Sequence, residues 1–118
     1  LGQIGHESSL PLLKKLLNDE EANIRWDSAI ALAKMGDSSG ASILNSLLSR
    51  TYYENFKEID SWETEKAILV AIHVSSQLGG KEFKENLLIL AKEDPNMDIR
   101  NAALKALEIV YNMEIGNG

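Results

Sequence analysis

The chain has 118 residues and no cysteine, and its 12 Lys plus Arg against 18 Asp plus Glu give a formal net charge of -6 at pH 7. A chain of this length without a disulfide framework is expected to form one domain, here residues 1–118. Its acidity disfavours nucleic acid, whose phosphates need cations, and no apolar run approaches the roughly 20 residues that cross a bilayer.

Three glycines, Gly5, Gly36 and Gly79, divide the chain into units that share one pattern. Each is followed by leucine after eight and eleven residues and by leucine or alanine after twelve: Leu13, Leu16 and Leu17; Leu44, Leu47 and Leu48; Leu87, Leu90 and Ala91. Only a helix places this i, i+3, i+4 spacing on one face. Because glycine also suits the left-handed turn that ends a helix, each unit is predicted to be helix, turn, helix.

In chain order, we expect residues 1–5 to end a helix and residues 6–9 to form a turn. The predicted helices then run up to Leu17, over 24–35, up to Leu48, over 61–78, up to Ala91 and over 99–111. Asp60 and Glu63 form a capping box that predicts the helix start near Ser61.

The two ends of the chain are expected to be cut from a longer stack, because residues 1–5 and 99–111 are predicted to be helices without a partner. Leu107 and Val110 would then lack a covering helix. Since solenoid ends need polar caps to stay soluble, the exposed ends are expected to favour self-association.

The segments "IRWDSAIALAKMGD" (Ile24 to Asp37) and "IRNAALKALEIVY" (Ile99 to Tyr111) share their phase and resemble HEAT-like repeats of the phycobilisome-lyase type. The middle unit departs, with Ala67-Ile68 in place of Ile-Arg. The resemblance implies an all-α fold, a right-handed α-α superhelix of three to four helix pairs that is truncated at both ends. It covers nearly the whole chain.

The same resemblance implies a structural ladder in which an aspartate at the end of one helix pair bonds the arginine of the next. Asp19 and Arg25 are six residues apart, as are Asp94 and Arg100. A guanidinium can reach a carboxylate and helix-end carbonyls together, which explains arginine at a partly buried seam. Anion binding by these arginines is the alternative.

An insertion at about residues 51–62, "TYYENFKEIDSW", makes the middle unit about twelve residues longer than the others. It is acidic and carries four of the seven aromatic residues, Tyr52, Tyr53, Phe56 and Trp62. The aromatics could plug the joint between repeats. Alternatively they could anchor a partner protein, because exposed Tyr and Trp are typical of interfaces. Since charged residues interrupt them, we expect the insertion to contribute more to partner binding than to folding.

The second helices of such repeats are expected to line the concave face, whose outward positions include Lys14, Lys15, Leu88 and Ile89. The face thus changes from basic to apolar along the chain. Leu88 and Ile89 lie beside Leu87 and Leu90 and are more apolar than one buried face needs, so a peptide could bind there. The alternative is ordinary variation of residues on a solvated groove.

We therefore interpret the chain as a non-catalytic scaffold or adaptor that needs no cofactor and binds another protein or peptide. The sequence does not fix the compartment, and the cytoplasm is favoured. One alternative is a HEAT-like DNA-base glycosylase, for which Trp62 and Asp60 are available but a basic groove is not. The other is a metal-dependent hydroxylase using His6-Glu7, but His6-Glu7 falls in the predicted turn and the only other histidine, His73, is followed by Val74. Too few ligands remain for a metal.

Overall fold

A computed structural model gives the backbone of residues 2–117 and the side chains of residues 9–110 and of Asn112. Residues 2–117 form six α-helices and three short 3-10 helices, with no strand. The α-helices are α1 (Gly2–Leu16), α2 (Ala22–Lys34), α3 (Ala41–Leu47), α4 (Ser61–Leu78), α5 (Lys84–Glu93) and α6 (Met97–Asn117). The 3-10 helices are η1 (Ser38–Gly40), η2 (Arg50–Asn55) and η3 (Lys81–Phe83). The predicted all-α class is confirmed.

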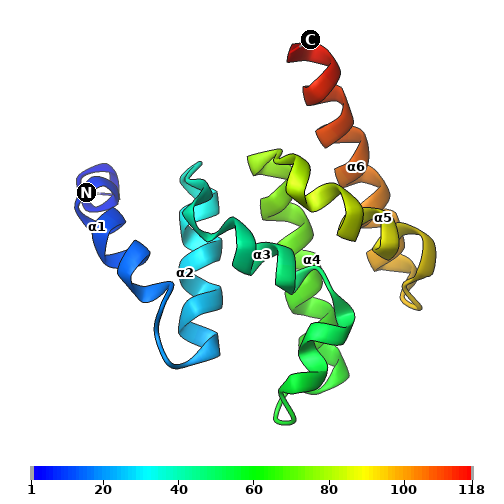
Figure 1. The fold of residues 1–118 in the computed structure, drawn as a ribbon, viewed down its shortest axis with the longest axis horizontal. Helices are drawn as coiled ribbons and strands as arrows, with labels where there is room; N and C mark the ends of the chain where they lie inside the picture. Colours follow the sequence, from blue (N-terminus) through cyan, green and yellow to red (C-terminus); the bar gives the residue numbers. More distant parts are fainter. Residues whose placement is uncertain (1, 118) are drawn as a thin grey trace.

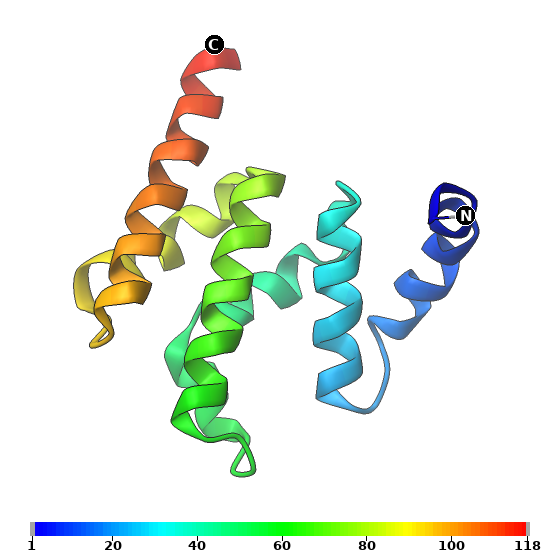
Figure 2. The same cartoon turned by 180° about the vertical axis from the view of Figure 1, so that it is seen from behind.

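Counted from α1, the helices pack as three successive pairs, α1 on α2, α3 on α4 and α5 on α6 (Figure 1). Helix α2 also packs on α3 across the Gly36 turn, so this glycine-centred unit of the sequence shares its helices with two of these pairs. Seen from behind, α2, α4 and α6 lie side by side as one layer (Figure 2). The molecule measures 43 × 40 × 22 Å. Because one helix with its side chains is about 10–12 Å across, the shortest dimension corresponds to two layers of helices. The fold is a two-layer stack of helix pairs, and the handedness of its superhelix stays a prediction.

Two of the three glycine turns have the predicted geometry. Gly36 (φ 80°) and Gly79 (φ 72°) both take the left-handed conformation just after α2 and α4. The capping box at α4 is also present, since Asp60 Oδ1 accepts from Glu63 N (2.8 Å) and Glu63 Oε1 accepts from Asp60 N (3.2 Å). Local sequence therefore determines both ends of α4, as predicted.

The third predicted turn, at residues 6–9, is wrong. Helix α1 runs unbroken from Gly2 to Leu16, so Gly5 and Pro11 lie inside a helix. A glycine within a helix costs only about 1 kcal/mol, and a proline forfeits one backbone hydrogen bond. Continuing the helix preserves the other backbone hydrogen bonds that a turn here would forfeit.

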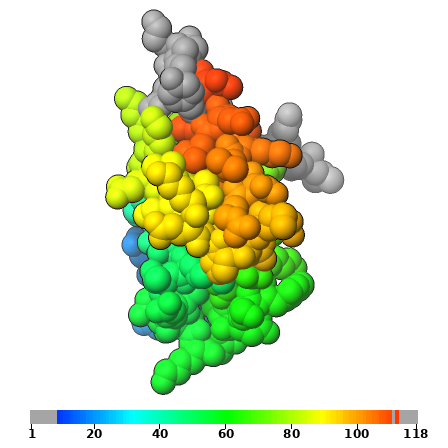
Figure 3. All heavy atoms as spheres, turned by 90° about the vertical axis from the view of Figure 1, so that its right-hand side faces the viewer, coloured from blue at the N-terminus to red at the C-terminus, as the bar shows by residue number. Residues whose placement is uncertain are grey.

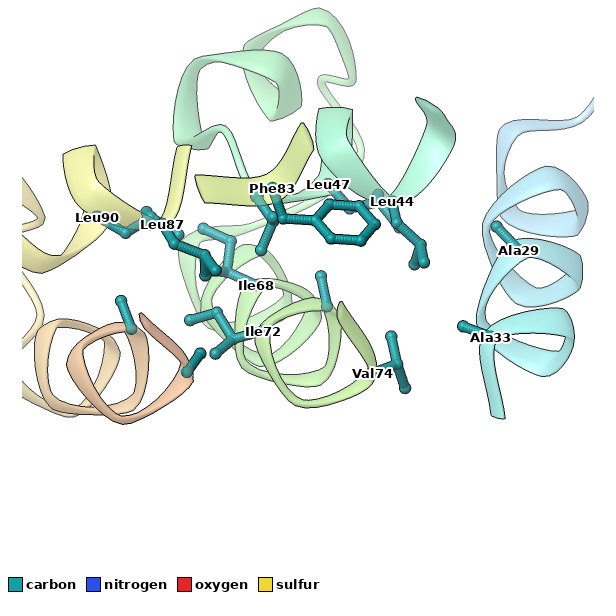
Figure 4. Packing of buried hydrophobic residues seen from close by; sticks show 14 of the residues in the cluster. Ala29, Ala33, Leu44, Leu47, Ile68, Ile72, Val74, Phe83, Leu87 and Leu90 are labelled. Carbon is teal, nitrogen blue, oxygen red and sulfur yellow. The ribbon is translucent and has the colours of Figure 1, made fainter. Parts of the chain in front are cut away.

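The core runs along the seam between the two layers (Figure 4). Phe83 is fully buried among the predicted leucines of α3 and α5 and the isoleucines of α4; the labelled members are Leu44, Leu47, Ile68, Ile72, Leu87 and Leu90. The small residues Ala29 and Ala33 of α2 are also buried. Each large buried side chain contributes roughly 1.5–3 kcal/mol, so the repeated leucine stripe supplies much of the stability.

Helix α6 is better covered than the sequence suggested. Val110 was expected to lack a partner helix, but it is fully buried, and Leu107 packs partly against the core. Ile99, Ala103, Ala106 and Val110 repeat at helical spacing and form one buried stripe. Figure 3 shows α5 beside α6 at this end of the stack. The prediction for Val110 was wrong because it assumed that only a following helix could cover this stripe.

Gly36 and Gly40 provide a test of this packing. A Cβ at Gly36 would meet no atom within 4 Å, so Gly36→Ala suffers only from its positive φ, at about 1 kcal/mol. A Cβ at Gly40 would lie 2.7 Å from the Ala29 Cβ and 2.8 Å from its Cα. Gly40→Ala must therefore push α2 away and is expected to cost about 3 kcal/mol. Urea unfolding of both variants measures the difference, and equal losses would contradict the close approach of η1 to α2.

Candidate functional site

The aromatic residues of the insertion gather around Trp26 of α2. The Trp26 ring meets Phe56, Tyr53 and Tyr52 edge to face, with centroids 5.1, 5.9 and 6.0 Å away. Trp26 Nε1 donates to the Tyr52 hydroxyl (3.0 Å), and the Tyr53 hydroxyl donates to the Leu47 carbonyl (2.7 Å). Such edge-to-face pairs add about 0.5–1.5 kcal/mol each beyond burial. We call these four residues the aromatic joint, because they tie α2 to η2.

The placement of these rings favours the alternative in which the aromatics plug the joint between repeats, while the expectation that the insertion serves partner binding more than folding stays a prediction. Tyr53 is only 4% exposed, and burial raises the pKa of its hydroxyl. Tyr52 and Phe56 are half-buried against the core. Their charged neighbours Glu54 and Lys57 point to water. The rings of the aromatic joint are thus buried or half-buried, while the charged residues between them stay in water. The alternation of aromatic and charged residues along the chain did not reveal this arrangement.

Trp62, the fourth aromatic residue of the insertion, behaves differently. It is the second residue of α4, and 66% of its surface is exposed. Its ring has the Lys66 ammonium 5.0 Å from its centroid, one helical turn further on. Tryptophan is enriched at protein interfaces and among the residues that carry most of their binding energy. Of the four predicted anchor residues, Trp62 alone keeps the exposure that the role needs.

A groove of about 500 Å³ lies between the first halves of α2 and α4, on the layer seen in Figure 2. Ile30 and Val70 give it apolar walls, and the buried Tyr53 lies beneath. Trp62 and Lys66 line one side, while the carboxylates at its edge are Asp27, Glu58 and Glu63. A second hollow of about 280 Å³ adjoins it and shares Trp26, Glu58 and Ile59. Together they form an apolar channel with an acidic edge, which we call the α2–α4 groove.

The predicted arginine ladder exists in part. Arg25 Nη1 donates to the main-chain carbonyls of Asp19 (2.7 Å) and Glu20 (3.0 Å), and Arg100 Nη1 donates to that of Asp94 (2.7 Å). The arginines therefore satisfy the carbonyls of the turn before their own helix. Neither Arg25 nor Arg100 makes a hydrogen bond or ion pair with a carboxylate of the described residues. The Asp19 carboxylate instead accepts from Glu21 N (2.9 Å).

Arg50, which the sequence did not single out, supplies the bond between neighbouring pairs. Its Nε and Nη2 donate to the two carboxylate oxygens of Asp94 (2.9 and 3.0 Å), and Nη2 also donates to Glu65 (2.9 Å). Bidentate pairs of this kind are the strongest ionic contacts in proteins. Arg50 lies fourteen residues after Gly36, and Asp19 lies fourteen residues after Gly5. The same repeat position is therefore basic in one unit and acidic in another, and this reversal was the sequence signal that could have pointed to Arg50.

The Asp94 carboxylate is the most buried charge of this group, at 5% exposure. Burial alone would raise its pKa. The hydrogen bonds from Arg50 and from Asn96 N, with the charges of Arg50 and Arg100, outweigh burial and lower the pKa of Asp94 below its ordinary value. The hydrogen bond to Asp94 is also the main cause that raises the pKa of Arg50. We call Arg50, Glu65 and Asp94 the ionic joint; it connects the turns of the second and third pairs.

The residues predicted for the concave face lie on α1 and α5. Lys14 and Lys15 are exposed, although Lys14 Nζ is 3.6 Å from Asp37 Oδ2. Leu88 and Ile89 are 45% and 47% exposed and stand apart from the α2–α4 groove. Their exposure agrees with the outward positions expected for them, and their role in binding stays a prediction.

The residues considered for catalysis do not come together. His6 and Glu7 lie inside α1, not in a turn, and their side chains fall outside the described residues. His73 is exposed on α4, and no three His, Asp or Glu side chains among the described residues could hold a metal ion. Asp60, paired with Trp62 in the glycosylase hypothesis, caps α4 through Glu63 N. Its carboxylate is thus already used in a helix start.

The geometry defines a class of protein, an all-α stack of helix pairs in which each pair covers the next. A family model described as HEAT repeats matches residues 1–59, half of the chain. The chain therefore belongs to the HEAT-repeat family; the narrower phycobilisome-lyase type stays a resemblance. Comparison with curated proteins and with solved structures found no match. No helix in the described part of the chain has the length and apolarity to cross a bilayer.

The ionic joint predicts a specific pH dependence. Because the pKa of Asp94 is lowered by folding, its contribution is present above its unfolded pKa of about 3.9 and is lost as pH falls through the folded value. Asp94→Asn is expected to lower the free energy of unfolding by about 2–3 kcal/mol near neutral pH, less than for a fully buried pair because Arg50 keeps Glu65. The deficit should shrink at acid pH. Urea titrations across this range measure it.

Asp98→Asn is the matched control, since Asp98 is exposed in the first turn of α6 and should contribute no more than about 1 kcal/mol. A deficit in Asp94→Asn that stays constant down to acid pH would show that the charge of Asp94 is not what stabilises the joint.

The two tryptophans should differ sharply in their effect on stability. Trp26→Ala removes the centre of the aromatic joint and is expected to cost about 3–5 kcal/mol. Trp62→Ala removes an exposed ring and should cost no more than about 0.5 kcal/mol. Urea unfolding followed by far-UV circular dichroism gives both values. Similar losses in the two variants would mean that Trp62 also packs in the fold.

Proposed function

We propose that this HEAT-repeat chain is a non-catalytic scaffold that binds another protein in the α2–α4 groove. HEAT repeats commonly serve as protein-interaction scaffolds. The observation that carries the proposal for this chain is Trp62, which projects from the start of α4 with two thirds of its surface exposed at the edge of an apolar channel. Aromatic side chains in such positions are the usual centres of binding energy at interfaces.

The groove also has the rigidity that a binding site needs. The buried Tyr53 closes it from below, and the aromatic joint holds Tyr53 against Trp26. The capping box fixes the first turn of α4 and with it the backbone of Trp62. A preformed groove loses little conformational entropy when a ligand enters. The insertion therefore supports binding indirectly, by shaping the floor under Trp62.

Leu88 and Ile89 on α5 are a second candidate surface, favoured by their exposure. They do not line the α2–α4 groove, whereas Trp62 does. We therefore place the principal contact at Trp62 and treat the α5 pair as a competing location for the same function.

The test compares partner capture by wild type, Trp62→Ala and Leu104→Ala, each immobilised as the 118-residue chain. Leu104 is the matched control because it is 51% exposed on α6, outside the groove. A protein retained by wild type is purified, and its Kd is measured with all three. Trp62→Ala is expected to weaken binding at least about tenfold, and Leu104→Ala less than about threefold.

The double variant Leu88→Ala/Ile89→Ala decides between the two surfaces. If it weakens binding while Trp62→Ala does not, the contact lies on α5 and the assignment to the α2–α4 groove is wrong. Circular dichroism of each variant confirms that the fold is retained.

A further inference from the structure

We propose that the segment bound in the α2–α4 groove is a basic amphipathic one, with a Lys or Arg side chain at Trp62 and an aliphatic side chain between Ile30 and Val70. This inference rests on the proposed function and specifies the chemistry of the partner. It follows from the charges at the groove, the state of the Trp62 ring and the apolar walls.

The carboxylates at the groove are available to a partner. Asp27 and Glu58 line it, and neither makes a hydrogen bond or ion pair with another described residue. The third carboxylate, Glu63, is partly occupied, because it accepts from Asp60 N. Lys66 is the one basic residue that lines the groove within the described chain. The edge is therefore acidic, and it attracts a cation and repels an anionic segment.

Trp62 already shows the kind of contact that a cation would make there. The Lys66 ammonium lies 5.0 Å from the ring centroid, within the range of a cation–π interaction. Because the ring is 66% exposed, much of it remains open to a second group. An incoming guanidinium could pack on this ring while its N–H groups reach the carboxylate of Glu58 or Asp27, as arginine prefers at aromatic and carboxylate sites.

The walls exclude the alternatives to an amphipathic segment. A purely hydrophilic segment would leave Ile30, Ile59 and Val70 uncovered, and these half-buried side chains provide the apolar contact. A purely apolar segment would cover the Asp27 and Glu58 carboxylates without giving them a partner, which is unfavourable. Only a segment that combines basic and aliphatic side chains satisfies both parts of the groove.

A second copy of the chain is the other possible occupant, because α1 exposes Leu12 and Lys15. The same helix packs on α2, and its Lys14 already has a partner in Asp37. Docking of one copy's α1 into the next copy's groove would also be a head-to-tail contact, which continues into a ring or a filament of molecules instead of ending at a symmetric dimer. We therefore assign the groove to a different protein and include self-association in the test.

The test uses two synthetic peptides, one amphipathic and built from leucine, alanine and lysine, the other with glutamate in place of every lysine. Titration calorimetry with the 118-residue chain should detect the lysine peptide and not its glutamate twin. Asp27→Asn/Glu58→Gln should weaken lysine-peptide binding about tenfold. The control Glu85→Gln/Glu108→Gln makes the same change in net charge at exposed sites outside the groove and should weaken it less than about threefold.

Equal weakening by both double variants would overturn the inference, since binding would then follow overall acidity. Tight binding of the glutamate twin would overturn it as well, as would self-association seen by sedimentation that Trp62→Ala abolishes. A partner whose capture depends on Trp62, combined with no binding of the lysine peptide, would leave the proposed function standing and the basic segment refuted. Capture that does not depend on Trp62 would instead refute the proposed function.

Discussion

Each helix pair in this protein can bury its apolar face only against the neighbouring pair, and the rest of the structure follows from that constraint. Phe83, from the turn before α5, reaches into the leucines of α3 and the isoleucines of α4, so the core belongs to no single pair. The small residues Ala29 and Gly40 let α2 and η1 approach closely between the first and second pairs. A stack built in this way leaves the outward sides of its helices free, and the α2–α4 groove occupies one of them.

The insertion shows how extra residues can be added to such a stack without disturbing it. They enter at the turn between α3 and α4, so the leucine registers on either side are unchanged. Their rings cover Trp26 and extend the core outward, while their charges remain in water. The surplus apolar surface that this leaves, the Trp62 ring and the groove walls, is where we expect a partner to bind.

The sequence predicted the elements whose signals are local. The capping box of Asp60 and Glu63, the left-handed Gly36 and Gly79, and the helical leucine stripe are all present. The turn predicted after Gly5 was wrong because a glycine does not by itself end a helix. A turn forms there only if packing against a neighbouring helix stabilises it. The candidate site was predicted less well. Tyr53 is buried where it packs on Trp26, which lies 27 residues before it on another helix. Arg50 and Asp94, 44 residues apart, pair for reasons that no local pattern contains.

The two seams between successive helix pairs respond differently to salt and acid, because one contains the aromatic joint and the other contains the ionic joint. The seam between the first two pairs is held by ring packing and a neutral hydrogen bond, whose strength is nearly independent of salt and acidity. The seam between the second and third pairs adds to its apolar core a guanidinium fork that holds two carboxylates. Acid conditions would therefore loosen α5 and α6 first and leave the α2–α4 groove intact, so that one end of the protein could change its curvature while the other kept its shape.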